Sequence, residues 1–130
     1  MSAEGLCVLA SKHDPAQTLE RLEAAILRHG FKIAARIDHQ AMAAAVGIEL
    51  RPAVVVMFGN PQAGAPTLQT APTLAIDLPL KVLIWQDEKG ATNVAYNDAT
   101  WLLARHGLSD LAIVEIMNEV MANIAGEAAS

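Results

Sequence analysis

Hydrophobic residues recur along the chain with two periods, one typical of helices and one typical of strands. The helical period is clearest over residues 14–30, where apolar positions three and four residues apart form one face. Asp14 suits the N-cap, Pro15 suits the first helical turn, and Gly30 suits the position after the last turn. The pattern therefore predicts an amphipathic helix with both ends marked.

A second long helix is predicted over residues 109–125, with Ser109 as its N-cap and Gly126 at its end. Its apolar positions form a broad stripe that we expect to cover a sheet. The stripe consists of Ile113, Ile116, Met117, Val120, Met121 and Ile124.

Strand-like segments occur before the first helix and between the two long helices. Residues 31–37 alternate, with Ile33 and Ile37 on the same face, and we expect this strand next to the first strand or antiparallel to it. Two further strands flank a polar turn at Gly90, which predicts a hairpin. Residues 54–58 are apolar on both faces, so helices or a partner subunit must cover both sides. The predicted strand segments are 5–10, 31–37, 48–58, 80–86 and 92–96.

Short helices are predicted at two Ala-rich segments, residues 38–46 and 99–105. We predict a loop over residues 59–65, followed by a short helix that begins at Pro66. This order of elements predicts one α+β domain over residues 1–130, with a mostly antiparallel sheet and the long helices on one face.

Composition restricts the possible partners. The 130 residues are 53% hydrophobic and carry a net charge of −5, and the nine basic residues are scattered singly. We therefore expect no binding to nucleic acid or to anionic membrane lipid. Cys7 is the single cysteine, so no internal disulfide can form. Apolar runs such as residues 53–58 are far shorter than the roughly 20 residues that span a bilayer, and we expect a cytoplasmic protein.

Titratable side chains concentrate at the predicted junction between a strand and a helix at residues 36–39. One interpretation makes His39 a general base, oriented by Asp38 and close to the cation of Arg36. The other makes Asp38 the N-cap of the following helix and leaves Arg36 and His39 in solvent. We favour this second interpretation, because Asp is a common N-cap residue.

Three other acidic or basic residues are candidates for chemistry. Glu49 and Arg51 lie two residues apart and project to the same side of a predicted strand, where a structural ion pair is favoured over binding of a carboxylate or phosphate. Asp77 is a lone carboxylate among apolar residues. It either fixes a loop or, if it lies buried in a cleft, acts as an acid or base.

Several familiar chemistries are disfavoured. Residues 59–64 have the spacing of a phosphate loop, but Ala65 and Pro66 stand where that motif needs lysine and a hydroxyl residue. The four histidines show neither the i, i+4 pairing nor the close carboxylate spacing of metal sites. We therefore predict no metal and no cofactor.

Several short runs together resemble the bacterial and archaeal family known as domain of unknown function 302. The runs are ARIDH (35–39), GIELRP (47–52), FGNP (58–61), IDLPLK (76–81), YND (96–98) and RHG (105–107), in the family's order and across residues 5–108. The resemblance implies a β-α-β4-α architecture like that of the TATA-box-binding protein, a curved antiparallel sheet with helices packed on one face, followed here by the helix over 109–125. It implies no catalytic residue, because the family's function is not established.

We predict a self-associating module, a dimer, that binds a small anionic or partly apolar ligand, with Arg36, His39, Arg51 and Asn60 at the rim of its pocket. The alternative is a small metabolite hydrolase or isomerase with His39 or Asp77 as general acid or base. A third hypothesis is a subunit that docks on another protein. The predicted ligand-binding residues are Arg36, Asp38, His39, Glu49, Arg51, Asn60, Asp77 and His106.

Overall fold

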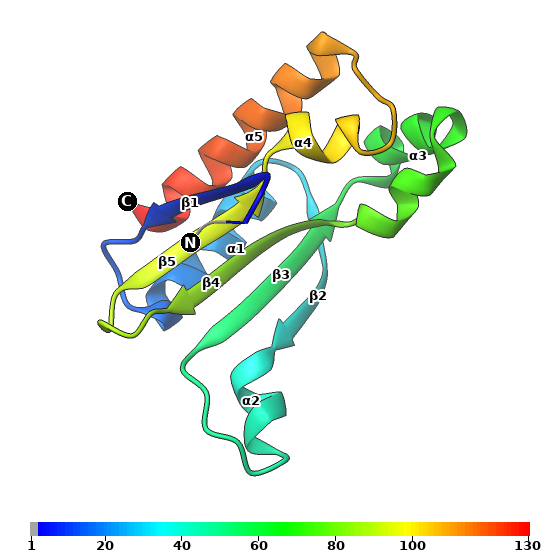
Figure 1. Ribbon diagram of the computed structural model, residues 1–130. Helices are drawn as coiled ribbons and strands as arrows, with labels where there is room; N and C mark the ends of the chain where they lie inside the picture. Colours follow the sequence, from blue (N-terminus) through cyan, green and yellow to red (C-terminus); the bar gives the residue numbers. More distant parts are fainter. Residues whose placement is uncertain (1–2) are drawn as a thin grey trace.

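The computed structural model describes residues 3–130 and contains a five-stranded antiparallel sheet in the order β1-β5-β4-β3-β2 (Figure 1). Its order of strands and long helices is the predicted β-α-β4-α architecture, with short helices inserted. The elements are β1 (Leu6–Ala10), α1 (Pro15–Arg28), β2 (Lys32–Asp38), α2 (His39–Ala44), β3 (Ala53–Gly59), α3 (Pro61–Thr70), η1 (Pro72–Asp77), β4 (Leu80–Gln86), β5 (Thr92–Asn97), α4 (Ala99–Ala104) and α5 (Leu111–Ala129).

The two long helices, α1 and α5, pack on one face of the sheet and on each other, as predicted. In Figure 1 they lie behind the strands, and the opposite face of the sheet is toward the viewer. Their buried side chains and those of the strands form the main hydrophobic core. That core consists of Leu22, Ala25, Ile26, Val56, Phe58, Val82, Ile84, Val94, Met121, Ile124, Ala125, Ala128 and Ala129.

Helix α1 begins and ends where the sequence places it. The carboxylate of Asp14 accepts a hydrogen bond from the backbone N–H of Gln17 at 2.8 Å, and Pro15 occupies the first turn. Gly30 follows the helix with a φ of +86°, a conformation that residues with a Cβ rarely adopt. The predicted N-cap and the predicted terminating glycine are therefore confirmed.

Helix α5 differs from its prediction at both ends. Asp110, and not Ser109, is the N-cap, since its carboxylate accepts from the amide of Ala112 at 3.0 Å. The helix also continues past Gly126 to Ala129, because the burial of Ala128 and Ala129 in the main core outweighs the modest helix penalty of one glycine.

The predicted apolar stripe of α5 is only partly buried. Met121 and Ile124 lie in the core, whereas Ile113 and Ile116 are exposed. The first half of α5 packs instead through Val114 and Met117, against the short elements near α4.

The prediction that residues 31–37 lie beside the first strand is wrong, because β1 and β2 form opposite edges of the sheet. The β4–β5 hairpin, itself confirmed, separates them together with β3. A bulge in β2 also reverses its alternation. Ile33 pairs with the buried Phe58, but Ala35 pairs with Met57, so Ile33 faces the helices and Ile37 faces away.

The segment after β3 is more helical than predicted. Asn60 caps α3, accepting from the amide of Gln62 at 3.1 Å, and Pro61 lies in its first turn. The expected loop over residues 59–65 is therefore largely helix, and Pro66 lies inside the helix. Asn60 followed by Pro61 is a start signal that the later Pro66 obscured.

The two ends of the sheet are built differently. At one end α3, η1, α4 and the start of α5 enclose a second, smaller core around Leu74, Leu103 and Val114. At the other end α2 and the chain that follows it protrude from the sheet (Figure 1). We call residues 39–52 the arm.

Candidate functional site

The structure does not bring the predicted pocket rim together. Arg51 precedes β3 and Asn60 follows it, so the seven residues of this strand, about 20 Å of extended chain, separate the two. The side chain of Asn60 is the cap of α3. Arg36 faces the helix side of the sheet, where it forms an ion pair with Glu23 of α1. The structure therefore contradicts the prediction that these three residues and His39 form the rim of a single pocket.

The interpretation of Asp38 as a helix cap agrees with the geometry. Its carboxylate accepts a hydrogen bond from the backbone N–H of Ala41 at 2.9 Å, at the first turn of α2. His39 is the first residue of α2 and is exposed. Arg36 donates a hydrogen bond to the carboxylate of Glu23, and this bond, followed by the charge of Glu23, raises the pKa of Arg36.

A broad, open hollow of about 840 Å³ lies between the arm, the start of β3 and the end of β4. Glu49 and Arg51 are the predicted site residues that line it, and they come from the arm. Asp87 and Glu88 contribute further carboxylates from the β4–β5 turn, so acidic side chains outnumber basic ones in the lining. Coulomb repulsion then disfavours the anionic ligand that the sequence suggested.

The carboxylate of Asp87 is already used by its own turn. It accepts hydrogen bonds from the side-chain amide of Asn93 and from the backbone amides of Ala91 and Lys89, each at 3.0 Å. The bond from Asn93, followed by that from Ala91, lowers the pKa of Asp87. This acid therefore stabilises the hairpin.

Asp77 and His106 form the most enclosed ion pair of the described residues. His106 Nε2 lies 2.5 Å from Asp77 Oδ2, and His106 Nδ1 lies 2.8 Å from Thr73 Oγ1. Arg105 donates to both carboxylate oxygens of Asp77 at 3.0 Å. The side chains of His106 and Asp77 are only 5% and 17% exposed. The cluster ties the end of η1 to the end of α4, beside the smaller core.

This cluster is better suited to hold elements together than to move protons. Burial by itself raises the pKa of Asp77. The hydrogen bond with His106 and the charges of Arg105 and His106 lower it by more, so the net pKa lies below the ordinary value for Asp. A general base works best with a pKa near the operating pH, so this carboxylate is a weak base. Both ring nitrogens of His106 are also engaged.

The face of the sheet opposite α1 and α5, which we call the open face, is largely apolar. The strand registers place Val55 and Met57 of β3 and Leu83 and Trp85 of β4 on it, and all four are partly exposed. Among residues 3–130, no member of the open face belongs to either hydrophobic core. Its apolar members are Leu6, Val8, Ala10, Ala35, Ile37, Ala53, Val55, Met57, Leu83, Trp85 and Ala95.

Sequence reasoning missed three residues of these sites. Thr73 and Arg105 complete the Asp77 cluster, and the RHG run at 105–107 was the signal for Arg105. Thr73 carried no such signal, because η1 brings it to His106 only in three dimensions. Trp85 could have been found from the apolar alternation of its strand.

Two further observations bear on cofactors and membranes. Within the described residues, no group of three or more His, Cys, Asp or Glu side chains is arranged to hold a metal ion. None of the helices described here combines the length and the hydrophobicity needed to cross a bilayer.

The geometry defines a class: a small antiparallel α+β module with one helix-covered face and one open apolar face. The chain belongs to the family described as domain of unknown function DUF302, whose model matches residues 8–125. A crystal structure of an uncharacterized conserved protein DUF302 from Bacillus stearothermophilus has the same fold, with a TM-score of 0.87 at 21% identity. The match covers 97% of this chain and 99% of that one.

Curated relatives of this chain carry a different description. The chain is 39% identical over 112 residues to fluoride-specific ion channel FluC 1 of Brucella suis biovar 1, and equally to FluC 2 of Brucella melitensis biotype 1. These matches cover 84% of this chain but only 44% and 42% of the relatives. The chain therefore spans less than half the length of the curated relatives that it matches.

Proposed function

We propose that this chain is a non-catalytic module that associates with a second copy of itself through the open face of its sheet. The observation that carries the proposal is the open face, where β3 and β4 present Val55, Met57, Leu83 and Trp85 away from the helices. The sequence prediction that both sides of this strand require a cover supports it, since α1 and α5 cover one side only.

The composition of this face supports an interface rather than an ordinary surface. Only Lys32, Lys81, Asn93 and Asn97 are polar among the positions that the registers place there, and Lys32 lies on the edge strand β2. The side chain of Lys81 is directed to the start of β4, where its ammonium donates to the carbonyls of Asp77 and Pro79 at 3.1 and 2.9 Å. Contiguous apolar surface of this kind, with few charges at its centre, is typical of protein interfaces.

The test is the mass of the protein in solution. Sedimentation equilibrium at micromolar concentration should give twice the chain mass of 13.8 kDa. Leu83→Lys should weaken the dimer at least tenfold, because it places a charge at the centre of a desolvated contact. Val8→Lys, on the exposed edge of the same face, tests the proposal with less risk to folding.

Leu27→Lys is the matched control. Leu27 is 60% exposed on α1, on the other side of the molecule from the open face, so its substitution should leave the dimer unchanged. A wild-type chain that stays monomeric at high micromolar concentration would remove the proposal. So would equal dissociation by the face variants and the control.

Ligand binding is a separate part of the proposed function. The hollow beside the arm supports it, although Glu49 and Arg51 are the only predicted site residues in its lining. A thermal-shift screen against metabolites and metal ions tests it, because a ligand that binds only the folded state raises the melting temperature. A ligand that acts at the hollow should lose its effect in Arg51→Ala.

We propose as a second candidate function that the chain acts as an accessory module of a fluoride channel. The supporting observation is the 39% identity over 112 residues with proteins named fluoride-specific ion channels, in a match that leaves more than half of each relative uncovered. A module that is joined to a channel in one protein and separate in another would act on it by docking.

Deletion of the matched segment from the Brucella suis relative tests this second candidate. The shortened channel should move fluoride from lipid vesicles differently from the intact one, and addition of this chain should restore the intact rate. The Leu83→Lys variant should restore it less, if the open face makes the contact. A shortened channel with the full rate, unaffected by this chain, would contradict the candidate function.

A further inference from the structure

The arm carries large apolar side chains that its own chain does not bury. The exposed fractions are 61% for Met42, 72% for Val46, 59% for Ile48 and 43% for Leu50. The structure describes every residue of α2, and none of them is buried. Four such side chains on one short protrusion exceed what scattered surface residues explain.

The arm nevertheless has a defined shape of its own. The cap of Asp38 starts α2, and Gly47 ends it with a φ of +79°, where the amide of Ile48 donates to the carbonyl of Ala43 at 3.0 Å. The side-chain amide of Gln40 then donates to the carbonyl of Leu50 at 3.0 Å. Local hydrogen bonds, and not core packing, therefore hold the arm in position.

The arm protrudes beside a hollow on the same side of the molecule. The hollow of about 840 Å³ is lined mostly by polar and charged side chains, but Ala53 and Trp85 at its border belong to the apolar open face. An apolar arm next to an apolar face is self-complementary under a two-fold axis, because each copy then offers what the other accepts.

The area of the open face also indicates that the arm takes part in the contact between two copies. Five strands spaced about 4.8 Å apart, each about 20 Å long, give a face of about 480 Å². A stable dimer needs about 800 Å² from each partner. The first value is a projected area and the second an accessible surface, but a five-stranded face of this size is small for such an interface, and the exposed side chains of the arm add contact area to it.

We propose that the arm of each copy packs onto the open face of a second copy, so that the two arms are exchanged across a two-fold axis. This inference rests on the proposed self-association and names the element that completes the interface. Val46 and Ile48 are then the main contacts of each arm with the apolar side chains of the partner's open face.

The test uses charged substitutions in the arm of the full chain. Ile48→Lys and Val46→Lys should each weaken the dimer about tenfold or more in sedimentation equilibrium. Both side chains are largely exposed in the single chain, so circular dichroism should show an unchanged fold. Leu27→Lys again serves as the matched control.

Mixing an arm variant with a face variant tests the exchange itself. In Ile48→Lys homodimers both arms are altered, and in Leu83→Asp homodimers both faces are altered. A mixed dimer of the two contains one intact arm on one intact face, and its second contact joins a lysine-bearing arm to an aspartate-bearing face. The mixture should therefore dimerise more tightly than either variant alone.

The outcomes separate this inference from the proposed function. If the wild type dimerises and Leu83→Lys dissociates it, but both arm variants keep the wild-type dissociation constant, the proposed function stands and the exchange of arms is overturned. An unrescued mixture also overturns the exchange, because arm and face then do not meet. A monomeric wild type overturns both.

Discussion

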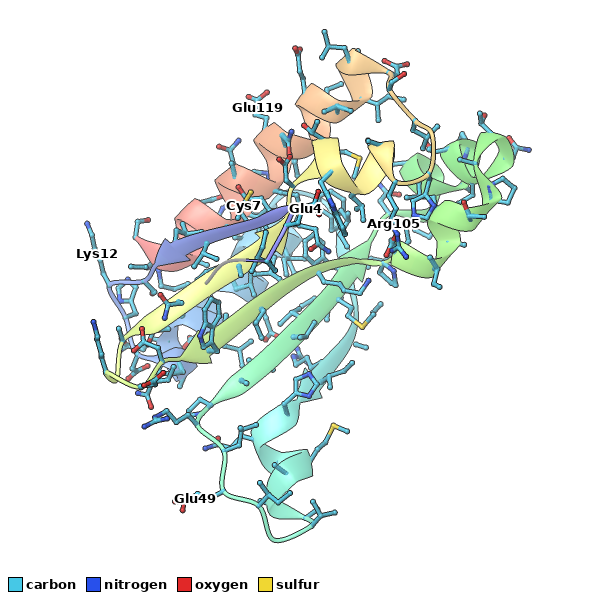
Figure 2. The ribbon with its side chains drawn as sticks, in the orientation of Figure 1. Glu4, Cys7, Lys12, Glu49, Arg105 and Glu119 are labelled. Carbon is cyan, nitrogen blue, oxygen red and sulfur yellow. The ribbon has the colours of Figure 1, made fainter. Side chains whose placement is uncertain are left out.

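The two ends of the sheet use polar and apolar residues in opposite ways. At one end the Asp77 cluster joins the end of η1 to the end of α4 with hydrogen bonds that satisfy His106 and Asp77. At the other end the arm leaves four large apolar side chains in solvent. Figure 2 shows Arg105 near the first end and Glu49 on the arm, at the far side of the sheet.

This contrast separates structural chemistry from functional surface. Titratable residues that look catalytic in the sequence, Asp77 and His106, are mutually satisfied and hold two elements together. Apolar residues that look unremarkable in the sequence, such as Val46 and Ile48, have no partner within the described chain to bury them. An unsatisfied side chain is therefore the better sign of a partner here.

The largest expected difference between the two ends is in core packing. Leu103→Ala should lower the free energy of unfolding by about 2–5 kcal/mol, because it leaves a cavity in the smaller core. Leu50→Ala, the same change on the arm, should lower it by less than about 0.5 kcal/mol. Urea unfolding of both in the dissociated Leu83→Lys background checks this. Equal losses would show that the arm is part of the folded core.

The second largest expected effect is the loss of stability when the Asp77 cluster is altered. Asp77→Asn should cost about 1–3 kcal/mol, because it removes the charged acceptor of the enclosed His106. Arg105→Gln should cost about 1 kcal/mol or less, since the side chain of Arg105 is 50% exposed and water screens its charge. Urea unfolding ranks the two variants by their free energy of unfolding, and the reverse order would contradict the assignment of His106 as the main partner of Asp77.

Acid should weaken the same end of the molecule. The folded state lowers the pKa of Asp77, so the unfolded state binds more protons in acid, and this carboxylate contributes stability above its unfolded pKa of about 4. The contribution should disappear as the pH falls through the lower folded pKa. Unfolding curves between neutral pH and about pH 2 should show the loss, and Asp77→Asn should reduce it. The pKa values of Glu127 and Asp87 are also lowered, first by the hydrogen bonds from Arg28 and from Asn93 respectively, so both carboxylates contribute to the loss.

The smallest expected effect compares two helix caps. Asp14→Ala should cost about 1 kcal/mol, because α1 packs on the main core. Asp38→Ala should change global stability by only a few tenths of a kcal/mol, since α2 buries none of its own residues. Hydrogen exchange should instead show faster opening of the α2 amides in Asp38→Ala. Slow amide exchange across the arm in the monomeric Leu83→Lys background would contradict the conclusion that the arm opens independently of the main core.

Much of the fold could be predicted because it depends on local signals. Asp14, Pro15 and Gly30 fix α1 through capping and backbone conformation, and Gly90 marks the hairpin turn. The position of β2 could not be predicted, because strand order depends on contacts far apart in sequence. The bulge that separates Ile33 from Ala35 likewise carries no sequence signal that alternation detects.

The candidate site was predicted less well for the same reason. Arg36 and Asn60 stand in conspicuous runs, but one pairs with α1 and the other caps α3. Asp77 and His106 were both selected, and only the tertiary structure brings them to within 2.5 Å of each other.

The sequence by itself determined the helices, the hairpin and the presence of a strand that is apolar on both sides, because these follow from period, capping and turn chemistry within a few residues. Tertiary structure alone decided which of the two sides α1 and α5 cover and which polar groups satisfy each other. Those outcomes depend on pairings between β3, β4 and β5 that only long-range packing selects.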